Sequence, residues 1–177
     1  VDIETFSTGR DAVIASVGAV RFDLETGQMG DEFYMNIDTE TQKKYGFKTD
    51  PDTLRWWSEQ SQDAKNALLS PQPVHIIHFA ERFVHFIGKK TAVWGNGSNF
   101  DNRVLREAYT LLGFRAPWHY RDDRDVRTLV ALGRSVGVNV KTKQEFEGTK
   151  HNALDDAKHQ VKYCCEIWEQ IRQPVLF

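Results

Sequence analysis

Three β-prone segments occupy the start of the chain, and this pattern restricts the fold more than any other feature. They cover Val1–Thr5, Ala12–Asp23 and about Gln28–Ile37, and they are rich in β-branched and aromatic side chains. The turn-forming sequence Glu25-Thr26-Gly27 separates the last two segments, as in a β-hairpin. The sequence therefore predicts an antiparallel sheet at the start of the chain.

Helical patterns dominate the rest of the chain, with one short β-prone segment, Thr91–Trp94, among them. Apolar spacing and capping residues predict helices over Pro51–Trp57, from Ser61 onward, and over Ile76–Ile87, Val104–Leu112, Asp125–Val136 and Asn152–Arg172. Strands that alternate with helices favour parallel pairing. We therefore expect an α/β fold whose mixed sheet has three antiparallel strands followed by parallel strands, flanked by helices.

A single domain over residues 1–177 is expected, because the sequence contains no repeat, low-complexity tract or Pro/Ser-rich linker that would divide it. Hydrophobic residues make up 40% of the chain, which is enough to form a sizeable core. Val1 stands partway along the first expected strand, so we expect further residues upstream.

Charge and cysteine content narrow the classes of function. The chain carries 23 Lys and Arg against 25 Asp and Glu, so it has no uniformly cationic surface, and a nucleic acid would have to be bound locally. Cys164 and Cys165 are adjacent and cannot form a disulfide framework. The longest apolar stretch, Val13–Val20, is too short to cross a bilayer. These features predict a cytoplasmic protein without a membrane partner.

Asp2 and Glu4 are two residues apart on the first expected strand. Their side chains should therefore project from the same face, with Cβ atoms ~7 Å apart, given a rise of ~3.4 Å per residue. Two anions this close favour a shared cation between them. A solvent-exposed strand end is the alternative for this pair.

Asp101 follows a Gly- and Asn-rich loop at or near the start of a helix. An acidic side chain there is also explained by helix capping, because free amides and the helix dipole favour a carboxylate in the first turn. The glycines of this loop do not form a phosphate-binding motif. Capping and metal ligation both remain open for Asp101.

The segment from His151 to Ala157 is the most informative part of the sequence. If Asn152 caps the helix, Asp155 is the third helical residue and reaches back as in a capping box. Asp156 lies about 100° further round the helix and is free to act as a ligand. His151 precedes the helix, and an imidazole so close to a carboxylate suits a general base. A polar surface histidine is the alternative.

These residues lie within three motifs of a known family. Asp2-Ile3-Glu4-Thr5, Asn99-Phe100-Asp101 and the segment from His151 to Ala157 match Asp-x-Glu-Thr, Asn-Phe-Asp and His-x-Ala-x-x-Asp-Ala. The chain thus resembles the DEDD superfamily of 3′–5′ exonucleases, in its histidine-containing DEDDh subgroup. It is particularly similar to phage and prophage exonuclease VIII-like proteins and to bacterial 3′–5′ exoribonuclease-like proteins. The resemblance extends over nearly the whole chain and implies a ribonuclease H-like fold.

The resemblance also implies a mechanism. It makes Asp2, Glu4, Asp101 and Asp156 ligands of a pair of Mg²⁺ or Mn²⁺ ions, and His151 the general base. The reaction would be hydrolysis of phosphodiester bonds at the free 3′ end of DNA or RNA, with release of nucleoside 5′-monophosphates. Similar proteins are often homodimers.

Substrate contacts are expected at Phe6, where core packing is an equal alternative, and at Thr5 and Asn99. Lysine and arginine side chains could guide the strand, and the alternative for them is a solvated charged face; these are Arg124, Lys141, Lys143 and Lys150. For Trp56 and Trp57, packing against the sheet is favoured.

Two other functions compete with the exonuclease. One is a noncatalytic nucleic-acid-binding module of the same fold, which would have no need to keep all the charged motif residues. The other is a phosphohydrolase of nucleotides or short oligonucleotides. One class of such enzymes has a histidine followed directly by Asp, and none of the six histidines of this chain is followed by Asp. Substrates of oligonucleotide size remain open.

Overall fold

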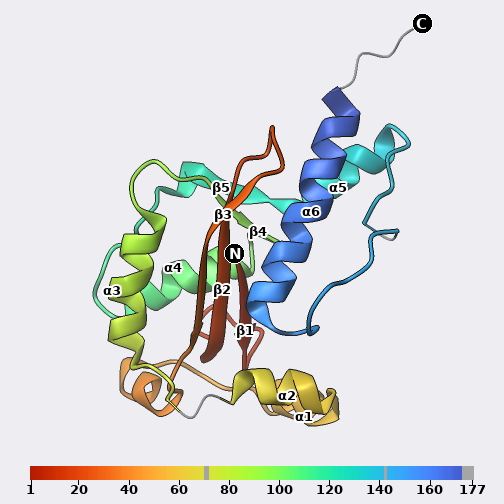
Figure 1. Cartoon of the computed structure of the whole chain (residues 1–177). Coiled ribbons are helices and arrows are strands. Elements are labelled where there is room, and N and C mark those ends of the chain that lie inside the picture. The colour runs from red at the N-terminus through yellow and green to blue at the C-terminus, as the bar shows by residue number, and fades with distance from the viewer. Residues whose placement is uncertain (70–71, 142, 173–177) are drawn as a thin grey trace, which may run out of the picture.

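A three-stranded antiparallel sheet forms the centre of the computed structural model, which describes residues 1–69, 72–141 and 143–172 (Figure 1). The strands β1 (Asp2–Thr5), β2 (Ile14–Phe22) and β3 (Met29–Asn36) lie in the order β1-β2-β3. The register pairs Asp2 with Gly18 and Glu4 with Ser16. The antiparallel start predicted from the sequence is confirmed, although β2 is shorter than the expected segment.

The parallel strands form a separate two-stranded sheet and do not continue the antiparallel one, so the single mixed sheet expected from the sequence is divided in two. The parallel strands are β4 (Val93–Gly95) and β5 (Asp123–Asp125). The Val1 nitrogen donates a hydrogen bond to the Trp94 carbonyl oxygen at 2.7 Å, so the start of β1 lies beside β4. β5 was not expected from the sequence, because its Asp-Arg-Asp sequence has no apolar side chain. The helix expected from Asp125 begins one residue later.

The helices agree with the expected segments to within a few residues. They are α1 (Pro51–Glu59), α2 (Gln62–Leu68), α3 (Ile76–Ile87), α4 (Asp101–Leu111), α5 (Val126–Ser135) and α6 (Ala153–Arg172), with 3₁₀ helices η1 (Glu40–Tyr45) and η2 (Tyr120–Asp122). Across the described ranges, no helix has the length and apolar character needed to span a membrane.

The 3₁₀ helix η1 was not expected from the sequence. It carries Gln42, whose polar side chain is fully buried. The side-chain amide of Gln42 forms hydrogen bonds with both main-chain polar groups of Ile14: Oε1 accepts from the Ile14 nitrogen at 2.9 Å, and Nε2 donates to the Ile14 oxygen at 2.7 Å. The side chain of Gln42 thus replaces a neighbouring strand at the beginning of β2. Such a partner is invisible to patterns of apolar residues.

The two faces of the antiparallel sheet are covered differently. Ile3 and Val17 point into the main hydrophobic core, to which α3 and α4 contribute Phe79, Phe83 and Leu105. The side chains that alternate with them face α6, which crosses the other side of the sheet (Figure 1). On this side Val20 packs against Ala157 and Val161 of α6.

Gly18 sets the distance between α6 and the sheet. A Cβ atom at this position would overlap the carbonyl group of Ala153 and the Leu154 nitrogen. The absence of a side chain therefore allows the first residues of α6 to lie against the main chain of β2, opposite Asp2 in the register.

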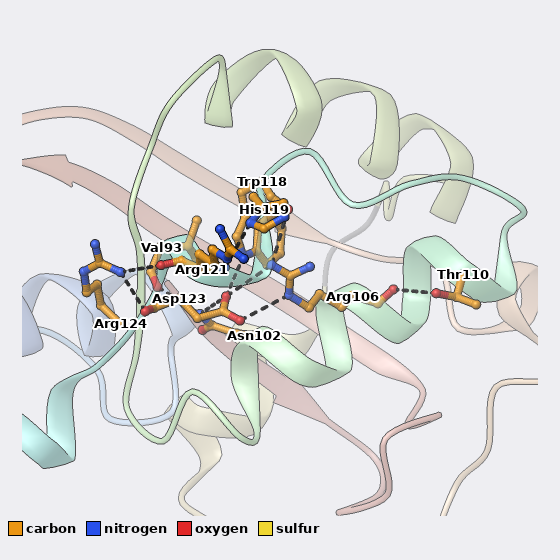
Figure 2. Close-up of polar contacts among 9 residues, drawn as sticks. All are labelled: Val93, Asn102, Arg106, Thr110, Trp118, His119, Arg121, Asp123 and Arg124. Atoms are coloured by element: carbon orange, nitrogen blue, oxygen red, sulfur yellow. Dashed lines mark hydrogen bonds and ion pairs between the residues drawn. The ribbon is translucent and has the colours of Figure 1, made fainter.

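A polar network centred on Asp123 fixes α4 relative to β4 and β5 (Figure 2). The Asp123 carboxylate accepts from Asn102 Nδ2 at 2.9 Å, from Trp118 Nε1 at 2.6 Å and from Arg106 Nε at 3.3 Å. Asn102 also donates to the Val93 carbonyl oxygen at 2.8 Å. Since Asn102 directly follows Asp101, the network also holds the Asp101 main chain in place.

Replacement of Asp123 by Ala should destabilise the protein without adding bulk. Asn102, Arg106 and Trp118 would each lose an acceptor, and a donor left unsatisfied costs about 1–3 kcal/mol. We expect the free energy of unfolding, measured by urea titration, to fall by about 2–3 kcal/mol. Asp122→Ala, at a neighbouring position on η2, is the matched control; an equal loss in both variants would contradict the role of the network.

Candidate active site

Asp2 and Glu4 project from β1 toward the face covered by α6, as strand alternation predicted. Gln160, on α6, donates a hydrogen bond from Nε2 to Asp2 Oδ1 at 2.8 Å. Glu4 is 9% exposed and lies toward the end of β1. Neither carboxylate belongs to a solvent-exposed strand end, which was the alternative considered for this pair.

The start of α6 supplies the next carboxylate. Asn152 caps the helix, since its Oδ1 accepts from the nitrogens of Leu154 at 3.0 Å and Asp155 at 3.3 Å. The expected capping box is wrong in detail: Asp155 accepts from the Thr149 nitrogen at 2.8 Å instead of reaching back to Asn152. Asp156 is not entirely free either, because its Oδ2 accepts from the His151 nitrogen at 2.7 Å.

His151 lies between β1 and the start of α6. Its Nδ1 is 3.9 Å from Glu4 Oε1, and single ligand atoms of Glu4, His151 and Asp156 lie within 4.8 Å of one another. The indole rings of Trp56 and Trp57 contact the imidazole edge-on, with centroid distances of 5.1 and 6.0 Å. His151 has a left-handed backbone, with φ of 65°. A strained backbone at a non-glycine residue is typical of functional sites.

Asp101 is the first residue of α4 and is 3% exposed. The helix cap is Phe100, and no side chain makes a capping hydrogen bond there. Asp101 is an acidic residue of the first turn, so stabilisation of the helix dipole and metal ligation both stay open for it. Gly95 makes room for the carboxylate, because a Cβ atom at Gly95 would lie 3.2 Å from Asp101 Oδ2.

The electrostatics show that four carboxyl groups share this region. Burial raises the pKa of Asp2 well above its usual value, and the charges of Asp101 and Asp156 raise it further. Burial, followed by Asp2, Asp156 and Asp101, raises the pKa of Glu4 to about 10. Burial also raises the pKa of Asp101 to about 6 and the pKa of Asp156. Without a cation, the protein therefore favours the neutral form of these carboxyl groups more than water does.

This cluster has the chemistry of a site for hard divalent cations. Its donors are carboxylate oxygens with one imidazole nitrogen, and no thiolate is among them. A cation would offset the burial and the mutual repulsion that raise the pKa values of Asp2 and Glu4. The group of Glu4, His151 and Asp156 has a spacing that could hold a metal ion.

A cleft of about 530 Å³ begins at Glu4. Aromatic side chains line it together with acidic and hydroxyl groups; its lining includes Ile3, Glu4, Thr5, Asp50, Trp56, Trp57 and Phe100. Trp57 Nε1 donates to the Thr5 oxygen at 2.8 Å, which fixes α1 against the end of β1. Trp57 thus packs against the sheet as expected, whereas Trp56 is 43% exposed.

The three expected substrate contacts occupy different surroundings. Thr5 lines the cleft, but its Oγ1 donates to the Ser7 oxygen at 2.8 Å. Phe6 packs edge-on against Trp57 and lines a neighbouring hollow with Leu54 and Leu69. Asn99 is exposed in the loop before α4.

Two features of the site were missed in the sequence. Gln160 is four residues after Asp156 and therefore on the same face of α6, so helical spacing was a usable signal for it. Trp56 was assigned to packing, yet it contacts His151. A contact between residues so distant in the sequence leaves no trace in local spacing.

Among the expected strand-guiding cations, Arg124 is already bonded, since its Nη1 donates to the carbonyl oxygens of Arg121 and Asp123, both at 2.9 Å (Figure 2). Lys143 is exposed. Lys150 lies close enough to Asp156 and His159 to affect the pKa of each, lowering both. Lys141 is half-buried, with Nζ 5.4 Å from the centre of the Tyr163 ring.

Comparisons with known proteins agree with this geometry. A family model described as the 3′–5′ exoribonuclease Rv2179c-like domain matches residues 1–168. No significant match was found among curated proteins or among solved structures. Because the family model spans nearly the whole chain, this protein belongs to the Rv2179c-like 3′–5′ exoribonuclease domain family.

Proposed function

We propose that this protein is a metal-dependent 3′–5′ exonuclease of the DEDDh subgroup with a ribonuclease H-like fold. The observation that carries the proposal is the convergence of Asp2, Glu4, Asp101 and Asp156 from three separate elements, with His151 beside them. The description of the family favours RNA as the substrate, and DNA is the substrate to compare with it.

The carboxylates of Asp2, Glu4, Asp101 and Asp156 would together hold a pair of Mg²⁺ or Mn²⁺ ions. When bound, such ions supply a nucleophile at neutral pH and neutralise the charge that develops on a phosphoryl group. The raised pKa values of Asp2, Glu4 and Asp101 support this assignment. They mean that the carboxylates are unfavourable in their charged form, and a bound cation would stabilise that form.

His151 is proposed as the general base. Its main-chain nitrogen is bonded to Asp156, and its ring is held between Glu4 and the indole of Trp56, so the orientation of the imidazole is restricted. A ring nitrogen of His151 would accept the proton of the attacking water. Neutral imidazole is the form that can take up this proton.

The aromatic cleft is proposed to hold the 3′-terminal nucleoside. It begins at Glu4 and is lined by Trp56, Trp57 and Phe100, whose rings offer surfaces for a base. Stacking on such surfaces is worth ~1–3 kcal/mol per base and tolerates different sequences. A nucleoside seated there would place its 5′ phosphate at the carboxylates.

A cleavage assay tests the proposal. RNA and DNA strands labelled at the 5′ end would be incubated with Mg²⁺, with Mn²⁺ or with EDTA. We expect a ladder of products that shortens from the 3′ side, with nucleoside 5′-monophosphates released, and no cleavage in EDTA.

Two results would contradict the exonuclease. Binding of the strand without any shortening would indicate the noncatalytic module. Hydrolysis of free nucleotides with intact oligonucleotides would indicate the phosphohydrolase.

A further inference from the structure

Arg127 lies beside the loop that leads to Asp101. Asp125 ties this loop to α5, because its Oδ2 accepts from the Ser98 nitrogen at 2.6 Å while its Oδ1 accepts from the Thr128 nitrogen at 2.8 Å. A Cβ atom on Gly97, whose φ is 109°, would lie 3.1 Å from Arg127 Cζ. The Gly97 oxygen in turn accepts from the Asp101 nitrogen at 3.2 Å. The guanidinium group therefore lies against the main chain that carries Asp101.

Arg127 belongs to a group of neighbouring cations that lack acidic partners. Arg127 and Arg134 are seven residues apart on α5, so they lie on similar sides of the helix. Burial lowers the pKa of Lys141, and the positive charges of Arg127 and Arg134 lower it further. Within residues 1–69, 72–141 and 143–172, none of the three has a carboxylate oxygen within 4.0 Å.

These three cations are neighbours without a carboxylate partner, in a chain whose formal charge is −2. Other lysines of this region are neutralised: Lys162 pairs with Glu147 at 2.5 Å, and Lys158 pairs with Glu32 at 2.7 Å. Cations that repel one another are stabilised by an anion that binds between them.

The position of Arg127 relative to the site indicates which anion this is. Arg127 lies against Gly97, whose oxygen accepts from the Asp101 nitrogen at 3.2 Å, so the guanidinium group borders the carboxylate cluster from the side of α4 and α5. The aromatic cleft borders the same cluster at Glu4, from the side of α1. A strand whose terminal nucleoside occupies the cleft would cross the carboxylates and continue over Arg127.

We propose that Arg127 and Lys141 bind the phosphodiester on the 5′ side of the scissile one. This inference rests on the proposed exonuclease function and specifies its substrate. A dinucleotide has a single phosphodiester, which must occupy the carboxylate cluster, so it leaves the cations unused. The preferred substrate is therefore a strand of at least three nucleotides, with two or more phosphodiesters.

The experiment compares Arg127→Ala, Lys141→Ala and the double variant with the wild type. The substrates are a pentanucleotide labelled at its 5′ end and a dinucleotide with a free 5′ hydroxyl, both in Mg²⁺. We expect kcat/KM for the pentanucleotide to fall about 10-fold or more in each single variant, mainly through KM, while the dinucleotide changes by less than about 2-fold. Arg127→Lys should restore part of the loss, because it keeps the charge.

Arg82→Ala is the matched control, since Arg82 is an exposed arginine on α3, on the other side of the sheet. It should leave both substrates unaffected. Equal losses on the pentanucleotide and the dinucleotide would overturn the inference, because Arg127 would then act at the scissile phosphate or on folding. No loss on the pentanucleotide would overturn it as well.

A binding measurement separates this inference from the proposed function. If the wild type cleaves no substrate in any metal, the exonuclease proposal fails, but fluorescence anisotropy of the labelled pentanucleotide in EDTA still tests the surface. Arg127→Ala should weaken that binding about 10-fold and make it less dependent on salt, and Arg82→Ala should not. Equal binding by all variants would refute the cation site.

Discussion

Asp156→Asn should lose cleavage activity by about 10³-fold or more, whereas the neighbouring Asp155→Asn should stay within about 3-fold of the wild type. Asp156 faces Glu4 and His151, while Asp155 turns away and accepts from the Thr149 nitrogen. Both substitutions keep the size of the side chain and remove one charge at the start of α6. The pair therefore separates a role in catalysis from a role in helix capping.

The measurements for this pair are initial cleavage rates on a 5′-labelled strand in Mg²⁺ and thermal melting in EDTA. Asp155→Asn should reduce the stability by about 1 kcal/mol, because a weaker acceptor faces the Thr149 nitrogen. Equal loss of activity at both positions would contradict the assignment of Asp156 to the metal site.

Glu4→Gln should abolish cleavage and at the same time stabilise the metal-free protein at pH 8. Burial raises the pKa of Glu4 to about 10, so the folded protein favours the neutral form of this side chain. An uncharged amide of similar shape meets that preference without titrating. A variant that is inactive and yet melts at a higher temperature in EDTA is difficult to explain by misfolding.

The pH dependence of the wild type follows from the same shifts. A carboxyl group with a raised pKa in the folded state contributes its full stabilisation below its unfolded pKa, and this is lost as pH increases toward the folded pKa. For Glu4 the loss extends from about 4.5 to about 10, and for Asp101 from about 3.8 to about 6. The melting temperature in EDTA should thus fall by about 5 °C or more between pH 5 and pH 8.

Addition of Mg²⁺ or Mn²⁺ should reverse this fall at pH 8 and have less effect at pH 5, where protons compete for the carboxylates. Glu4→Gln should show a smaller fall with pH and a smaller response to metal. A wild-type melting temperature that is the same at both pH values, with no response to saturating metal, would contradict a shared cation site.

Most of the fold followed from local patterns. The three strands, the six α helices and the cap at Asn152 are each encoded by neighbouring residues, through alternation, helical spacing or side-chain hydrogen bonds. The exceptions β5 and η1 depend on tertiary partners. Asp123 is held by Asn102 and Arg106, and Gln42 bonds to Ile14, contacts that join segments 17 to 28 residues apart in the sequence.

The candidate site divides in the same way. Residue type and resemblance nominated the four carboxylates and His151 as candidates, and the structure brings them into one region. The surroundings of His151 could not be predicted from the sequence. Its left-handed backbone, its contact with Trp56 and the position of Arg127 against Gly97 result from chain segments that meet only after folding.

The contact of Gly18 with Ala153 has a consequence for how sequences of this kind diverge. Since main chain meets main chain there, no side chain stands between Gly18 and the first residues of α6. A methyl group at position 18 would push the turn that carries Asp156 away from the strand that pairs with Asp2, whereas the apolar residues on the opposite face of the sheet do not enter this contact. Related sequences with the same site are therefore expected to keep glycine at position 18.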